Sequence, residues 1–171
     1  MRNSETEETT ALIQKIRDAF ANTVRPDKGN ILPGDLYDHW EASETYEMLA
    51  DASWQDIPSN VLAYRGLALV YLTPEALAYF LPGIMISCLA NPAAAGNLFD
   101  AVLFQLMPPR KDDSDFSHWK DRFERFAASL TQQQRQAVCD FFEFNCDECP
   151  DFVFDDDLRA LEFWKTFSKQ A

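Results

Sequence analysis

Residues 73–107 read TPEALAYFLPGIMISCLANPAAAGNLFDAVLFQLM, and this stretch sets the fold class that we expect. Its first three residues form a helix start, because a capping hydroxyl is followed by a proline suited to the first turn and by an acid near the positive end of the helix dipole. From residue 76 onward the stretch carries one charge, Asp100. We therefore expect it to form the buried helical core of the protein, with Pro82 kinking or ending the first helix.

The segments on both sides of this core also carry helical patterns. Further predicted helices cover residues 4–24, 35–49, 61–72, 97–107, 116–130, 131–146 and 156–169. Residues 61–72 have the β-branched and aromatic composition of a strand, but their length and lack of alternation favour a helix. The sequence thus predicts an all-α protein, residues 1–171, as a single compact domain of about seven helices around a central apolar helical core. Residues 1–34 are expected to supply an N-terminal helix and a loop that pack on the core.

The composition excludes several classes of protein. The 171 residues include 28 acids and 15 bases, the net charge is −13, and 47% of the residues are hydrophobic. This apolar content excludes an intrinsically disordered chain. The excess of acids disfavours nucleic-acid binding and adhesion to anionic membranes, because both depend on basic surfaces. The N-terminus lacks the apolar stretch of a signal peptide, so we expect a cytoplasmic protein with no nucleic-acid and no membrane partner.

Motifs of known enzyme classes are missing from the sequence. A phosphate-binding loop needs clustered glycines, and the five glycines here are scattered. Two histidines are too few for a three-histidine metal site. We therefore predict a non-enzymatic protein without a cofactor. An unrecognised enzyme site around His39, Glu41 and Asp56 remains an alternative, since a histidine beside carboxylates can act as a general base.

The four cysteines divide into two kinds. Cys88 and Cys139 stand among apolar neighbours and are expected in the core as small hydrophobic residues. Cys146 and Cys149 have the spacing of a zinc half-site or a redox pair. Their acidic neighbours would raise the pKa of both thiols, which opposes redox reactivity, and no second pair follows in the sequence. We expect no metal at this pair.

The sharpest local feature is the stretch from residue 140 to residue 158, which holds eight acids, no base and five phenylalanines. It can be a solvated face with an acidic cap on the last helix, or a docking surface for a basic partner. In the second reading aromatic side chains serve as anchors and acids steer the partner. The predicted partner-binding residues are Asp147, Glu148, Asp151, Phe152, Phe154, Asp155, Asp156 and Asp157.

Several short motifs resemble a family of small, uncharacterised bacterial cytosolic proteins. The motifs are WQDI at residues 54–57, YLTPEA at 71–76, YFLP at 79–82 and the LT-x-x-Q pattern at 130–134. The resemblance covers roughly residues 35–145 and implies an all-helical fold and a cytosolic location. It brings no catalytic residues with it.

The same motifs suggest a small-molecule pocket at one end of the central helices. Its lining would be polar and aromatic, from Trp54, Asp56, Tyr71 and Tyr79. The alternative is that Asp56 caps a turn and that the aromatic side chains fill the core.

Taken together, these features predict a non-enzymatic acidic protein-binding domain. Its most concrete form is an immunity-type inhibitor that neutralises a basic toxin or effector by occluding the toxin's site. The alternative is a housekeeping scaffold or adaptor, which could form a homodimer. The unrecognised enzyme is the third hypothesis.

Overall fold

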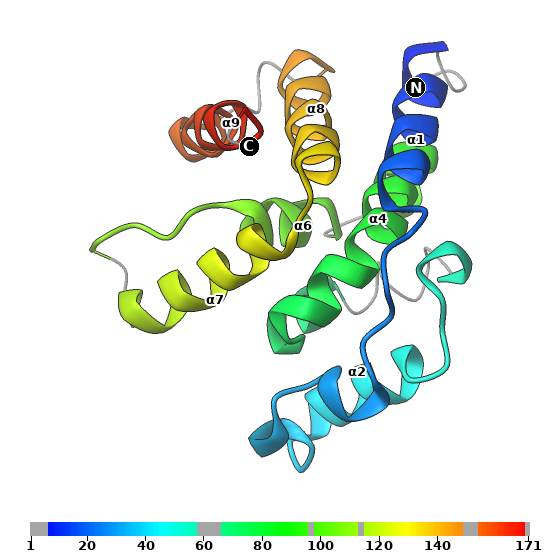
Figure 1. Ribbon diagram of the computed structural model, residues 1–171, viewed down its shortest axis with the longest axis vertical. Helices are drawn as coiled ribbons and strands as arrows, with labels where there is room; N and C mark the ends of the chain where they lie inside the picture. Colours follow the sequence, from blue (N-terminus) through cyan, green and yellow to red (C-terminus); the bar gives the residue numbers. More distant parts are fainter. Residues whose placement is uncertain (1–6, 58–65, 96–97, 113–114, 149–153, 170–171) are drawn as a thin grey trace. The chain divides into compact units, whose positions relative to one another are not determined.

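The computed structural model describes residues 7–57, 66–95, 98–112, 115–148 and 154–169 (Figure 1). Within these ranges every regular element is helical and no strand occurs, so the predicted all-α class is confirmed. The α-helices are α1 (Glu7–Phe20), α2 (Trp40–Leu49), α4 (Pro74–Ala90), α5 (Pro92–Ala95), α6 (Leu98–Leu106), α7 (Phe116–Ser129), α8 (Gln132–Glu148) and α9 (Asp155–Phe167). Short 3-10 helices are η1 (Lys28–Asn30), η2 (Gly34–Leu36), η3 (Trp54–Asp56) and η4 (Gly66–Tyr71). Across the described ranges, no helix has the length and apolar character that a membrane span requires.

The chain folds as two compact units. One unit, called here the terminal unit, comprises Met1–Ala21 and Leu106–Ala171, and the central unit comprises Asn22–Gln105. Helix α1 therefore belongs with α7, α8 and α9, which lie more than 90 residues further along the chain. Residues 1–34, expected to supply a helix and a loop that pack on the core, are divided between the two units after Ala21.

Helix α4 forms the core of the central unit, as the apolar stretch predicted. Fourteen of its 17 residues are buried. The predicted cap is present, because the Ala76 N–H donates to Thr73 Oγ1 at 3.1 Å. The helix does not end at Pro82 but continues to Ala90. A proline removes one helical hydrogen bond, and close packing on nearly every side of α4 compensates for that loss.

Gly83 allows η3 to lie directly on α4. A Cβ atom at this position would stand 2.1 Å from the Trp54 carbonyl oxygen, which is far inside van der Waals contact. Only glycine therefore permits this approach of two backbones. Because Trp54 is itself buried, the approach brings its indole into the core of the central unit.

Polar contacts fix the loops of the central unit to its helices. The Thr73 N–H donates to the Ile31 carbonyl at 3.0 Å, and the Thr73 hydroxyl donates to the Asn30 carbonyl at 2.6 Å. Arg25 donates from Nη2 to the carbonyls of Leu49 and Ala50 at the end of α2. A cation at this position stabilises the negative end of the helix dipole.

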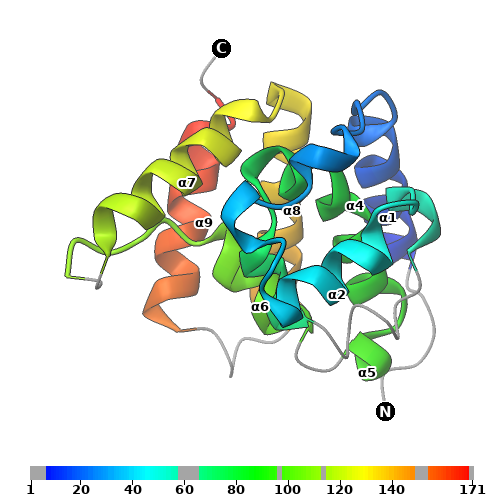
Figure 2. The same ribbon diagram turned by 90° about the horizontal axis from the view of Figure 1, so that it is seen from below.

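Helix α8 is the central helix of the terminal unit and contacts both α1 and α9 (Figure 2). The predicted capping box opens it: the Thr131 N–H donates to Gln134 Oε1 at 2.9 Å, and the Gln134 N–H donates to Thr131 Oγ1 at 3.3 Å. Phe141 and Phe142 are fully buried. One ion pair on each side supplements the packing, Lys15–Asp140 to α1 and Lys165–Glu143 to α9.

Several helix boundaries differ from the prediction. Helix α1 ends at Phe20 rather than residue 24, because the chain leaves the terminal unit there and Val24 is exposed. The expected helix 35–49 is interrupted, so that η2 precedes an α-helix starting at residue 40. Residues 66–71 form a 3-10 helix instead of an α-helix, and residues 61–65 lie outside the described ranges.

Replacing Gly83 with alanine tests the close approach of η3 to α4. We expect Gly83→Ala to lower the free energy of unfolding by about 1–3 kcal/mol, since a backbone oxygen must move away from the new methyl group. Chemical denaturation measures the effect. Gly34→Ala is the matched control, because a Cβ there meets nothing within 4 Å. Equal stability of the two variants would contradict the close approach.

Candidate functional site

The predicted docking residues fall into three different environments. Asp147, Phe154 and Asp155 are exposed, Asp156 is half-buried and Asp157 is buried. Asp151, Phe152 and the side chain of Glu148 lie outside what the structure describes. The acidic run that looks uniform in the sequence therefore divides its members between solvent, an ion-pair cluster and a helix cap.

Asp157 caps the start of α9. Its Oδ2 atom accepts a hydrogen bond from the Phe154 N–H at 2.9 Å, and the residue is 5% exposed. A carboxylate at the third position of a helix commonly satisfies the free backbone N–H of the residue before the helix. This side chain is therefore used inside the protein.

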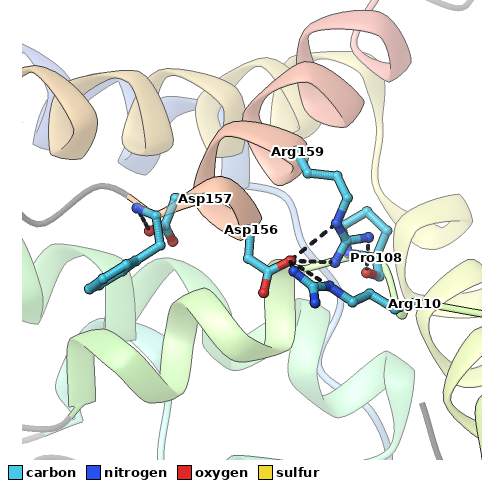
Figure 3. Close-up of polar contacts among 6 residues, drawn as sticks. Pro108, Arg110, Asp156, Asp157 and Arg159 are labelled. Atoms are coloured by element: carbon cyan, nitrogen blue, oxygen red, sulfur yellow. Dashed lines mark hydrogen bonds and ion pairs between the residues drawn. The ribbon is translucent and has the colours of Figure 1, made fainter. Parts of the chain in front are cut away.

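Asp156 is the centre of an ion-pair cluster (Figure 3). Its Oδ1 atom accepts from Arg110 Nε at 2.8 Å and lies 2.6 Å from Arg110 Nη2. Arg159 donates to the same oxygen from Nε at 3.3 Å and from Nη2 at 3.2 Å. Burial disfavours the charged carboxylate, but the hydrogen bonds from the two arginines outweigh it and hold the pKa of Asp156 below its ordinary value.

Residues 106–110 run from the end of α6 into the connection that leads to α7. Three of these residues contact α9, and we call the segment the 106–110 strap. The Leu106 carbonyl accepts from Trp164 Nε1 at 2.8 Å, and the Pro108 carbonyl accepts from Arg159 Nη1 at 2.6 Å. The side chain of Arg110 completes the series at Asp156. Residues 106, 108 and 110 thus contact α9 at residues 164, 159 and 156, in that order. The strap therefore runs antiparallel to the helix.

The outward side of α9 carries an exposed apolar pair among acids. Phe154 is 69% exposed and Leu158 is 53% exposed, and they are one helical turn apart. Asp155 and Glu162 are exposed beside them. We call these four residues the α9 patch. The other exposed large hydrophobic side chains of the described ranges belong to the central unit: Val24, Trp40 and Phe104.

The three cysteines that the structure describes, Cys88, Cys139 and Cys146, are free thiols. Cys88 and Cys139 are buried as predicted, and burial raises the pKa of their thiols to about 12 and about 11. Burial, followed by the charges of Asp157 and Asp147, also raises the pKa of Cys146. Cys149 lies outside the described residues, and no group of three metal-ligating side chains occurs within them.

The members of the predicted pocket differ in exposure and in their partners. Trp54 and Tyr79 are buried in the central unit, whereas Asp56 is exposed. Asp56 belongs to a turn in which its own N–H donates to the Ser53 carbonyl at 3.0 Å. The fourth member, Tyr71, is bound to a different group of side chains.

Tyr71 joins two residues of the alternative enzyme site. Its hydroxyl donates to Glu41 Oε2 at 2.5 Å, and its ring lies 5.1 Å from the His39 ring, centroid to centroid. No hydrogen bond or ion pair connects Asp56 to this group among the described residues. The hydrogen bond to Glu41 raises the pKa of Tyr71, so its phenol stays protonated near neutral pH and acts as a donor rather than a base. Sequence reasoning missed Tyr71 as the link because 30 residues separate it from Glu41.

Comparison with known proteins gives one match. The model of a protein family of unknown function, DUF6714, matches residues 8–168, which is most of the chain. No curated protein and no solved structure matches it.

Replacing Asp156 with alanine tests the ion-pair cluster. We expect Asp156→Ala to lower the free energy of unfolding by about 1 kcal/mol, because two guanidinium groups lose a shared carboxylate that is only partly exposed to solvent. Thermal or chemical unfolding measures the change. Asp155→Ala is the control, since it removes an equivalent charge from the same helical turn without an arginine contact. Equal losses in the two variants would show that the arginines contribute nothing.

The Tyr71–Glu41 hydrogen bond predicts a pH dependence of stability. The pKa of Tyr71 in the folded state lies above its ordinary value of 10.0. As the pH rises, the unfolded chain therefore loses the phenolic proton before the folded protein does. The stability that this hydrogen bond contributes is complete below the ordinary pKa, and it is lost as the pH rises through the higher pKa of the folded state. We expect the alkaline loss of stability to be smaller in Tyr71→Phe than in the wild type.

Denaturant unfolding at neutral and alkaline pH measures this difference. Tyr37→Phe is the matched control, because its hydroxyl donates to the neutral Lys28 carbonyl at 3.1 Å. An identical pH response of the two variants would refute the prediction.

Proposed function

This chain belongs to the DUF6714 family of unknown function, and we propose that it is a non-enzymatic protein-binding domain that docks a basic partner protein through the α9 patch. The observation that carries the proposal is the exposure of Phe154 and Leu158 side by side among acids. Single exposed hydrophobic residues are common on protein surfaces, but an adjacent pair with an acidic surround has the composition of a docking site.

The chemistry of the patch favours a basic protein. Phe154 and Leu158 supply an apolar centre of the kind that is desolvated in an interface. Asp155 and Glu162 supply acids at its margin, where charges mainly affect the association rate and partner choice. The net charge of −13 adds a long-range attraction for a basic surface.

The most concrete form of this function is an immunity-type inhibitor in the cytoplasm, which neutralises a basic toxin or effector by occluding its site. The exposed side of a single helix is convex, so it fits a concave surface such as a cleft. An acidic helix in a basic cleft would exclude the anionic substrate that the cleft normally binds.

The second candidate function is that of a scaffold or adaptor, which could form a homodimer. Self-association through the α9 patch would place the same acids of two copies against each other, because the contact surfaces of a twofold dimer are identical. That repulsion makes a basic partner the better occupant of this surface.

Affinity capture from a lysate of the native host, at low salt and with a salt gradient for elution, tests the proposal. We expect the wild type to retain one stoichiometric basic protein that salt releases. The triple variant Phe154→Ala/Asp155→Asn/Leu158→Ala should lose it. The matched variant Val24→Ala/Trp40→Ala/Glu47→Gln, which alters the same kinds of exposed side chain in the central unit, should keep it.

Other outcomes of the capture separate the alternatives. Retention of the partner by the triple variant would reject the α9 patch as the surface. A partner that is acidic or insensitive to salt would favour the adaptor. The lack of any partner at every salt concentration would reject the protein-binding function.

Single variants should then differ in how they weaken binding. We expect Phe154→Ala to raise the Kd by roughly 30-fold, as the loss of a central aromatic anchor does. We expect Asp155→Asn to act mainly on the association rate and to flatten its dependence on salt. Surface plasmon resonance with the purified partner measures both rates. An unchanged Kd for Phe154→Ala would remove its role as an anchor.

A further inference from the structure

Helix α1 is connected to the rest of its unit only through the central unit. It packs on α8, which begins at residue 132, but the chain that leaves α1 first passes through residues 22–105. The terminal unit is therefore built from two separate pieces of chain. The α1 of a second copy could make the same contact with α8, because identical atoms would meet.

The connection between α1 and the central unit has the character of a hinge. Phe20, the last residue of α1, is fully buried, and Arg25 is bound to the carbonyls at the end of α2. Residues 21–24 lie between these two fixed points and outside the helices. Pro26 disfavours helical backbone at Arg25, so the sequence favours an extended connection at this place.

Val24 is the hinge residue that an exchange of α1 would bury. Its side chain is 86% exposed, the largest fraction among the exposed large hydrophobic residues of the described ranges. A β-branched side chain favours extended backbone and the pairing of extended segments. If two copies exchange α1, their hinge segments cross from one copy to the other, where the two Val24 side chains can be buried against each other.

We propose that this chain forms a domain-swapped dimer, in which the α1 of each copy packs on the α8 of the other copy. The inference does not depend on the proposed function. The burial of Ile16 and Phe20 is retained in the exchange, so the hinge is the segment that changes its conformation. The dimer does not use the α9 patch, and it therefore avoids the repulsion between acids that a twofold contact through that patch would bring.

The oligomeric state after refolding is the first test. We expect wild type refolded at high protein concentration to contain a dimer, and wild type refolded at low concentration to be a monomer. Sedimentation velocity measures both at physiological salt, which screens the repulsion between chains of charge −13. The isolated dimer should persist after dilution, because its return to monomer requires Ile16 and Phe20 to leave their buried positions. A wild type that is monomeric at every concentration overturns the inference.

The ion pair between Lys15 of α1 and Asp140 of α8 distinguishes a swapped dimer from any other dimer. Lys15→Glu turns this pair into two acids, and Asp140→Lys turns it into two bases. A swapped heterodimer of the two variants restores opposite charges at both contacts, whereas each homodimer places like charges together. In an equimolar mixture refolded together, we expect the heterodimer to make up about four fifths of the dimer instead of the statistical half. Native mass spectrometry with one variant isotopically labelled measures this share.

The ion pair between Lys165 of α9 and Glu143 of α8 provides the matched control. Both helices belong to the continuous segment from residue 106 onward, so this pair stays within one chain whether or not α1 is exchanged. A mixture of Lys165→Glu and Glu143→Lys should therefore contain the statistical half of heterodimer. Circular dichroism verifies that each variant is folded.

A variant of the hinge covers the case that Asp140→Lys does not fold. Val24→Asp places a charge where the two hinges are expected to cross, and the exposure of Val24 makes the change harmless to the monomer. We expect it to lower the dimer share several-fold, whereas Val24→Ile should keep the wild-type share.

The opposite results overturn the exchange. A statistical share of heterodimer for Lys15→Glu with Asp140→Lys would show that α1 stays on its own chain. An equal excess of heterodimer in the control mixture would show that the charges act between whole chains rather than at the contact of α1 with α8. A dimer share that is the same in Val24→Asp and Val24→Ile would remove the hinge from the dimer contact.

Discussion

The rotation of α9 is set by one buried tryptophan. Trp164 is fully buried, and its indole N–H donates to the Leu106 carbonyl, so the helix can neither turn nor slide without breaking this bond in an apolar environment. Rings surround it on two helices, Phe123 and Phe126 from α7 and Phe163 and Phe167 from α9. With Trp164 inward, helical periodicity places Leu158 and Glu162 outward. The composition of the α9 patch is thus a consequence of the core.

The sequence predicts best those features that depend on neighbouring residues. The caps at Thr73 and Thr131 were predicted from local patterns and are confirmed by their hydrogen bonds. The apolar core of α4 and the buried positions of Cys88 and Cys139 follow from composition alone. Each of these features is determined within one helical turn or one continuous apolar stretch, which is the range over which sequence patterns are informative.

Features that join distant residues could not be predicted. The strap contacts connect residues 46 to 58 positions apart, and nothing in the local sequence links Arg110 to Asp156 or Leu106 to Trp164. The different roles of Asp155, Asp156 and Asp157 depend on where α9 begins. Because the predicted start lay one residue late, the capping position of Asp157 was not recognised. Within the described residues, the reading as a solvated face with an acidic helix cap fits the exposed Asp147 and Asp155 and the capping Asp157.

The discontinuous composition of the terminal unit has a consequence for biosynthesis. Helix α1 is made before the central unit, but its packing partner α8 begins at residue 132, after that unit. The central unit can complete its fold on the ribosome during this interval, whereas the terminal unit can assemble only once the later helices have emerged. Until α8 emerges, the side of α1 that packs on α8 is open to chaperones or to misassembly.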